Sequence, residues 1–124
     1  MMADLTRHNP ALASAARTAS TDSALFVNQN RRGCQVLIDM TAITATGDVT
    51  FKVQGYDELS GTYYDLITSA SVTTVSEVML KIYPGLTAAA NLTVSDNLPY
   101  LYRITTTHLN GVSMTYSVGV NLLI

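Results

Sequence analysis

From Ala24 to the C-terminus, short runs of alternating apolar and polar residues are separated by turn-forming residues. In one such run Val49, Phe51 and Val53 alternate with polar residues. Because successive side chains of a β-strand point to opposite faces, this period of two indicates strands with one buried face. The composition agrees, since the chain has two Glu and two Lys and is rich in Thr, Val, Ile and Tyr. The sequence therefore predicts an all-β fold.

The predicted strands are joined by turn signals at a spacing typical of β-sandwiches. We expect a hairpin loop from Asp57 to Gly61, a stop at Pro84-Gly85, and one helical turn within 87–91. The strands are predicted at 35–43, 49–56, 62–68, 72–83, 100–108 and 112–122. They favour an antiparallel two-sheet β-sandwich of the immunoglobulin-like (Ig-like) kind, with a jelly roll as the alternative topology.

The last two predicted strands flank the pair Asn110-Gly111, which is typical of a β-hairpin. A two-residue turn would place the apolar set of the last strand on the same face as Arg103. A three-residue loop, with Gly111 left-handed as a bulge, pairs His108 with Val112 instead. We therefore expect the bulged hairpin.

Residues 1–23 differ in composition from the rest, because Ala, Ser and Thr dominate and few large apolar residues occur. Through Cys34 four Arg stand against two Asp, whereas from Gln35 onward three basic residues stand against seven acidic ones. A short helix at 10–17, capped by Asn9, and a disordered tail are two interpretations. A third is an extended N-terminal arm that lies on a neighbouring subunit. We expect this arm at 1–23 and the sandwich domain at 24–124. The candidate partner-binding residues are Leu5, Arg7, Leu12, Arg17, Arg31 and Arg32.

Several function classes are disfavoured by composition. A net charge of −2 does not suggest nucleic-acid binding, and one Cys with two His cannot form a structural zinc site, so no cofactor or metal is expected. No apolar run is long enough for a membrane span or a signal peptide, so we expect synthesis in the cytoplasm. The chain lacks a Gly-x-Ser-x-Gly elbow, and its histidines, His8 and His108, lie in the tail and at a strand end. We expect no enzymatic activity and no catalytic residue.

Three groups of side chains remain to be interpreted. The acidic residues Asp57, Glu58 and Asp65 lack the spacing of a calcium loop and are interpreted as a solvated hairpin. Cys34 begins an apolar strand and is interpreted as a buried, unreactive thiol. Tyrosines on an outward face bind proteins or sugars in other sandwich modules. The possible outer surface consists of Tyr56, Tyr63, Tyr64 and Tyr83.

Several segments resemble those of known virion proteins. They are Val36–Ile43, Val53–Asp57 with Ser60–Tyr64, Ile82–Asn91, Leu98-Pro99 and Thr115–Gly119. In these segments the body is similar to small virion structural proteins of tailed bacteriophages, of the capsid decoration or cement kind. The segment Asp96-x-Leu98-x-Tyr100 also resembles the tyrosine corner of Ig-like sandwiches.

The resemblance to virion proteins implies a decoration protein located in the phage head. Its partners would be the major capsid protein or other virion subunits, and it would form homo-oligomers, with a trimer expected because such proteins often lie on three-fold axes. The arm would then clip neighbouring subunits together. Two alternatives stay open at this point, a neck or tail structural subunit and a carbohydrate-binding or adhesin module.

Overall fold

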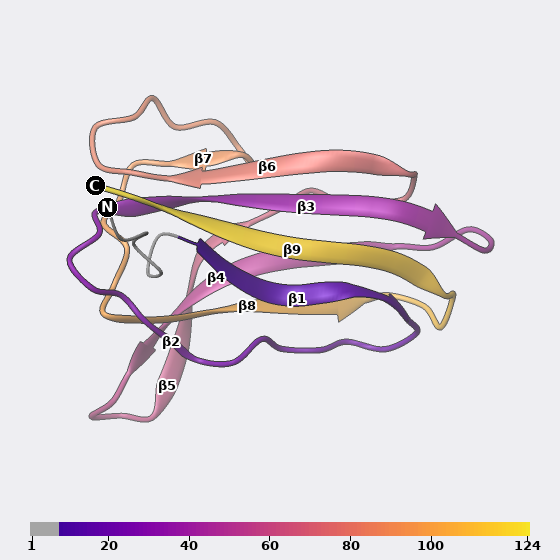
Figure 1. Cartoon of the computed structure of the whole chain (residues 1–124), viewed down its shortest axis with the longest axis horizontal. Coiled ribbons are helices and arrows are strands. Elements are labelled where there is room, and N and C mark those ends of the chain that lie inside the picture. Colours follow the sequence, from indigo (N-terminus) through magenta and orange to yellow (C-terminus); the bar gives the residue numbers. More distant parts are fainter. Residues whose placement is uncertain (1–7) are drawn as a thin grey trace, which may run out of the picture.

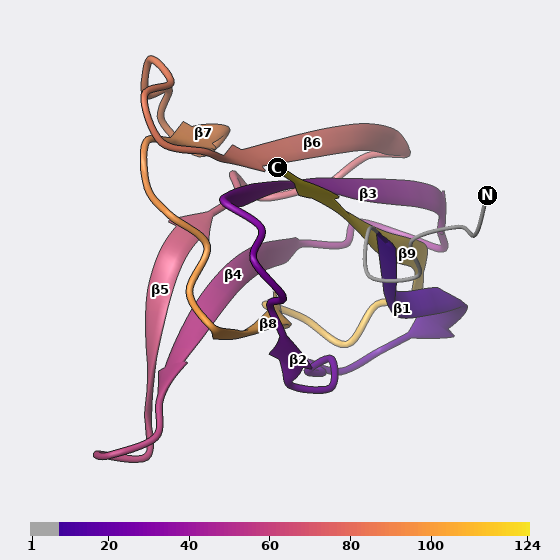
Figure 2. The ribbon, with the colours of Figure 1, turned by 60° about the vertical axis from the view of Figure 1, so that its left-hand side comes forward.

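The computed structural model describes residues 8–124, which form two β-sheets packed face to face (Figures 1 and 2). The five-stranded sheet has the order β1-β9-β3-β6-β7 and the four-stranded sheet the order β2-β8-β4-β5. The strands are β1 (His8–Arg17), β2 (Phe26–Val27), β3 (Gly33–Ile43), β4 (Val49–Asp57), β5 (Thr62–Thr68), β6 (Ser76–Ile82), β7 (Thr93–Val94), β8 (Leu101–His108) and β9 (Met114–Leu123). The all-β sandwich predicted from the sequence is confirmed. No helix in this part of the chain is long and apolar enough to cross a membrane.

The strand order is that of a jelly roll. The antiparallel partners are nested, because β4 pairs with β5, β3 with β6, β2 with β8 and β1 with β9, and successive pairs alternate between the two sheets. A jelly roll is such a long hairpin rolled into two layers. In the Ig-like arrangement the last two strands are neighbours in one sheet. Here β8 and β9 lie in different sheets, so the alternative topology is the one observed.

The expected bulged hairpin between the last two strands is therefore wrong. Gly111 is absent from the positive-φ residues, and His108 pairs with Val49 rather than with Val112. Both apolar rows face the interior, but from opposite layers. An alternating pattern fixes which face of a strand is buried and leaves open which sheet contains the strand. The Asn110-Gly111 segment is thus a crossover between the sheets, and its Asn110 side chain donates to the carbonyl oxygen of Thr46.

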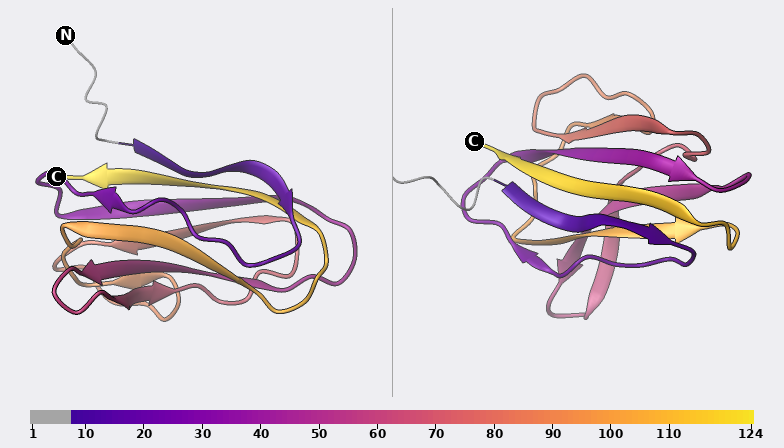
Figure 3. Two further views of the ribbon diagram at one scale, coloured as in Figure 1. Left: turned by 90° about the horizontal axis from the view of Figure 1, so that it is seen from below. Right: turned by 45° about the vertical axis from the view of Figure 1, so that its right-hand side comes forward.

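Within the N-terminal segment, residues 8–17 form a strand of the sandwich. Residues 10–17 form no helix, because they continue strand β1, which pairs with β9 of the same chain from His8–Asn121 to Arg17–Met114. Figure 3 shows β1 running alongside β9. Residues 8–17, which the sequence assigned to an arm, thus lie in the sandwich. Small side chains suit this place, because they let the strand lie on β9 without a large apolar face of its own.

Other local differences have simple causes. Strand β6 begins at Ser76, while Val72 forms an isolated bridge to Val49, so the predicted strand at 72–83 is interrupted. Residues 87–91 form turns and a bridge instead of a helical turn. Tyr100 is 63% exposed, so it does not form the buried corner that its spacing suggested. The hairpin at Asp57–Gly61 is confirmed, with Gly61 at a φ of 68°.

The core consists of the inward rows of both sheets. Each inward residue alternates with a more exposed one, as the period of two predicted for β4 and β6. The largest fully buried side chains include Phe51 of one sheet and Tyr116 of the other, whose rings meet edge to face with centroids 5.1 Å apart. This contact joins the two layers near the centre of the fold.

We expect Phe51→Ala to lower the free energy of unfolding by about 3–5 kcal/mol, because it leaves a cavity against Tyr116. Leu59→Ala is the control, since Leu59 is 97% exposed and its truncation should change stability by less than about 0.5 kcal/mol. Urea unfolding followed by circular dichroism measures both. Equal effects of the two substitutions would contradict the described core.

Candidate functional site

The outer face of the four-stranded sheet contains a row of apolar and aromatic side chains. Val27 pairs with Leu101, and Tyr56 pairs with Tyr63. The last paired residues of β4 and β8 are Gly55 and Tyr102. The next residues along these antiparallel strands, Tyr56 and Leu101, therefore lie side by side. The row therefore crosses all four strands. Val27 is 47% exposed, which is unusual for the solvent face of a sandwich.

A network of charged and polar side chains lies next to this row. Arg103 donates to Asp22 at 3.2 Å and to the Gln54 side-chain oxygen at 3.0 Å. Gln54 in turn donates to Asp65 at 2.8 Å, and Lys52 reaches the other oxygen of Asp65 at 3.2 Å. The hydrogen bond from Gln54, followed by that from Lys52, lowers the pKa of Asp65. Each of these two carboxylates therefore has a cation beside it within the chain.

The aromatic row and the polar network meet at Tyr63. Its ring stacks obliquely on Tyr56 with centroids 4.6 Å apart, and the Arg103 guanidinium lies 3.5 Å from its centroid. Such a cation over an aromatic ring is favourable and holds both groups in place. One face of Tyr63 is thus covered by Arg103 and is not open to a stacked sugar ring.

We call this surface the four-strand face; it consists of Asp22, Val27, Lys52, Gln54, Tyr56, Tyr63, Asp65, Leu101 and Arg103. Of the predicted tyrosines it unites Tyr56 and Tyr63. Tyr64 lies over Gly55 on the inward side of the same hairpin, because a Cβ on Gly55 would come within 2.3 Å of its ring. Tyr83 directly follows β6 of the other sheet, and its hydroxyl donates to the carbonyl oxygen of Ile124. The four tyrosines therefore do not form one surface.

Arg103, Gln54 and Val27 were not among the candidate residues predicted from the sequence. Arg103 stands between the buried residues Tyr102 and Ile104, so the period of two already placed it on an outward face. Which outward residues become neighbours depends on strand order, and that order was not available from the pattern.

The predicted arm residues are not brought together. Leu12 packs against the core of its own chain. Arg17 lies near the start of β9, where its guanidinium is 4.6 Å from the Tyr116 ring centroid and donates to the Tyr116 carbonyl oxygen at 2.7 Å. Arg31 and Arg32 lie beyond the other end of β9, next to Leu123. Leu5 and Arg7 lie outside the described residues.

A second polar cluster surrounds Tyr116. Its hydroxyl is 2.8 Å from Nε2 of His108, and Nδ1 of His108 is buried without a hydrogen-bond partner. Burial, and then the charge of Arg17, lowers the pKa of His108. This arrangement favours the neutral imidazole.

The other candidate groups are separate. Asp57 accepts hydrogen bonds from Ser60 and from the backbone of Leu59, which lower its pKa, while Asp65 belongs to the network described above. Within residues 8–124 no cluster of His, Cys, Asp or Glu could hold a metal ion. Burial raises the pKa of Cys34 to about 12, so its thiol stays protonated.

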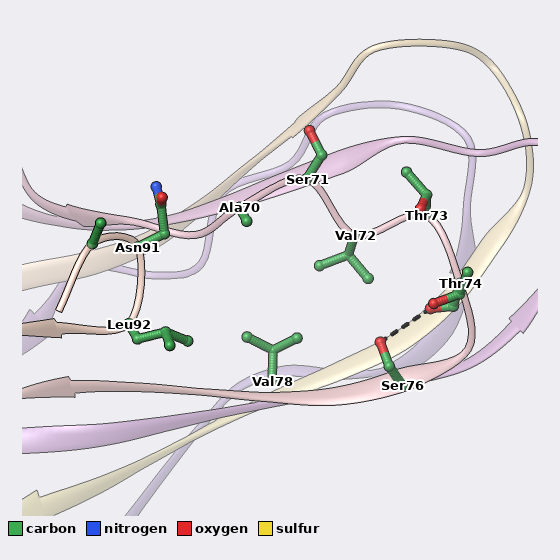
Figure 4. Close-up of a pocket in the computed structure, with 10 residues that line it drawn as sticks. Ala70, Ser71, Val72, Thr73, Thr74, Ser76, Val78, Asn91 and Leu92 are labelled. Atoms are coloured by element: carbon green, nitrogen blue, oxygen red, sulfur yellow. Dashed lines mark hydrogen bonds between the residues drawn. The ribbon is translucent and has the colours of Figure 1, made fainter.

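A pocket of about 300 Å³ lies between β6 and the segment 70–74. Figure 4 shows Val72 and Val78 pointing toward one another across it, with Leu92 beside them. Apart from the amide Asn91, the residues that line it are small, hydroxylic or apolar, and none has an ionisable side chain. The pocket can accept an apolar group and has no means of acid–base chemistry.

Comparison with solved structures gives a resemblance of fold. The crystal structure of the SPBc2 prophage-derived protein YomS matches with a TM-score of 0.49 and 14% sequence identity, over 98% of this chain and 99% of that chain. The chain resembles a prophage-derived protein. This likeness concerns the fold alone. Neither a scan against protein-family models nor a search of curated proteins gives a match.

The environment of His108 gives a pH dependence of stability. Because its folded pKa lies below the ordinary 6.5, the unfolded chain takes up a proton as the pH falls below 6.5 while the folded chain resists it. We therefore expect the melting temperature to fall between pH 7 and the lowered pKa, and His108→Gln to flatten this slope. His8→Gln, at an exposed position, is the control. A slope unchanged by His108→Gln in thermal melts would contradict this origin.

Proposed function

We propose that the chain is a structural subunit of a phage particle, and specifically a decoration protein that binds the major capsid protein on the outside of the head shell. The observation that carries the proposal is the four-strand face, in which the exposed Val27 and the half-buried Leu101, Tyr56 and Tyr63 form a row beside Arg103. Tyrosine and arginine are the residue types enriched in protein–protein contacts. The proposal also rests on the segment resemblance to small virion proteins.

The composition of the four-strand face favours a protein partner over a small ligand. Its residues come from four strands, so it is broad, and none of them lines the described pockets. Its ion pairs, Arg103 with Asp22 and Lys52 with Asp65, neutralise most of its charge. A broad, nearly neutral surface with exposed aliphatic groups loses little on desolvation when another protein covers it.

The fold is compatible with this role. Jelly-roll sandwiches recur in viral capsid proteins and also in lectins. Because one fold hosts many functions, the surface and not the topology distinguishes these two classes. Arg103 covers one face of Tyr63, which leaves a poorer platform for a sugar than two open rings.

The test measures binding of purified protein to undecorated head shells. We expect the double variant Tyr56→Ala/Arg103→Ala to bind at least about tenfold more weakly, because truncation of two central contact residues commonly costs this much. The matched control is Met79→Ala/Lys81→Ala, which removes one apolar and one cationic residue from the outer side of β6. Cosedimentation with the shells, at several protein concentrations, gives both affinities.

Each other outcome has a definite meaning. A loss confined to the control variant would assign the contact to the five-stranded sheet and contradict the four-strand face. Failure of the unaltered protein to bind shells would overturn the decoration role. Copy number per particle would then identify a neck or tail ring, and binding on a glycan array would identify an adhesin.

The proposed clip between neighbouring subunits is now restricted to the residues before β1. Since residues 8–17 pair with β9, deleting them would damage the fold and would not report on an arm. Deletion of residues 2–7 is the appropriate variant, and we expect it to lower the occupancy of the shells while leaving the melting temperature unchanged. Undiminished occupancy would refute the clip without touching the proposed role of the four-strand face.

A further inference from the structure

The described part of the chain, residues 8–124, has four sheet edges: β1 and β7 in one sheet, β2 and β5 in the other. An edge strand presents unpaired backbone groups that can pair with another chain, and proteins usually block this with short strands, prolines, bulges or charges. Strands β2 and β7 are two residues long, which is one such protection.

The edge at β1 is protected in several ways. It contains Pro10, and its pairing with β9 shifts register twice, between Pro10 and Leu12 and between Leu12 and Ala15. Arg17 also bends back and donates to the carbonyl oxygens of Ala13 at 2.5 Å and Ala15 at 3.2 Å. The proline, the register shifts and the Arg17 hydrogen bonds occupy or displace the backbone groups with which a further strand would form hydrogen bonds.

Strand β5 has little such protection. Its sequence, Thr-Tyr-Tyr-Asp-Leu-Ile-Thr, contains no Pro, Gly, Lys or Arg and favours β structure. Its one charged residue, Asp65, is paired with Lys52. A register shift with β4 follows Asp65, and Asn91 donates to the carbonyl oxygen of Thr68, so both features lie in its C-terminal half. The stretch 62–65 is left regular, in the hairpin that extends away from the body (Figure 2).

We propose that β5 pairs antiparallel with β5 of a second copy of this chain, around a two-fold axis at Tyr64. The two four-stranded sheets then form one continuous sheet of eight strands. The proposal is independent of the shell-binding function, because it concerns a contact between identical chains in solution.

The distribution of side chains favours a second copy as the occupant of this edge. Directly opposed residues of an antiparallel pair lie on the same face of the sheet. With Tyr64 on the axis, Tyr63 of one copy comes opposite Asp65 of the partner subunit. Since the Arg103 guanidinium lies over Tyr63, each carboxylate approaches a cation of the other copy, and no like charges are opposed. The edge is thus complementary to itself at this register.

So short a strand contact is at the lower end of stable interface sizes, and we expect a concentration-dependent dimer. Sedimentation velocity over a series up to about 1 mM should show a monomer–dimer equilibrium. Tyr64→Lys should shift it toward monomer by at least about tenfold, because two ammonium groups would face each other on the axis. Asn121→Lys, on the exposed side of β9, adds the same charge elsewhere and should leave the equilibrium unchanged.

A cross-linking experiment tests the register even if Tyr64→Lys disturbs the fold. Because the native thiol of Cys34 is fully buried, it is not accessible for cross-linking. Any disulfide-linked dimer is therefore formed by the introduced cysteine. Tyr64→Cys should form a disulfide-linked dimer under mild oxidation, whereas Asn121→Cys should not. A protein that stays monomeric over the whole series, or a dimer that resists Tyr64→Lys and yields no cross-link through Tyr64→Cys, overturns the proposal. In the first case an extended segment of another protein is the remaining occupant of the edge.

Discussion

The packing around the ring of Tyr116 is the interaction on which most of this structure depends. The ring comes from the last strand, contacts Phe51 in the opposite sheet, and lies beneath the guanidinium of Arg17 from the first strand. Its hydroxyl reaches His108 at the end of the neighbouring sheet. One side chain therefore connects both layers and both ends of the chain. The apolar rows on either side of Tyr116 enlarge the buried contact between the two sheets. The contacts of Tyr116 itself fix how the two sheets are aligned.

The same junction explains why the N-terminal segment belongs to the body of the protein. A strand of small residues buries little apolar surface, so its attachment needs directional contacts. Arg17 supplies them through the Tyr116 carbonyl and ring, and Leu12 adds a partly buried aliphatic group. Leu12 and Arg17, two of the residues predicted to contact another subunit, thus serve their own sheet. Among residues 8–124 no further strand covers the four-strand face, and for this reason it is the better candidate for a partner.

The sequence predicted the elements well and their neighbours less well. Alternation placed Val49, Phe51 and Val53 inside, and the loop ending in Gly61 was located correctly, because these features depend on a few adjacent residues. The partner of β9 depends on residues from the whole chain, and the Asn-Gly pair gave a local signal that tertiary packing overrode. The candidate site shows the same division. Tyr56 and Tyr63 were two of four tyrosines proposed for an outer surface, but their approach to Arg103 required the order of the strands.

The nested pairing has a consequence for biosynthesis. Strand β9 leaves the ribosome after the other eight strands, yet it is inserted between β1 and β3 and pairs with both along most of its length. Until β9 emerges, β1 has no partner strand in its sheet. The part of the core that β9 and β1 cover stays open. Folding of this sandwich is therefore completed only after β9 has emerged. Loss of a few C-terminal residues would remove part of a central strand, which is far more damaging than trimming an edge.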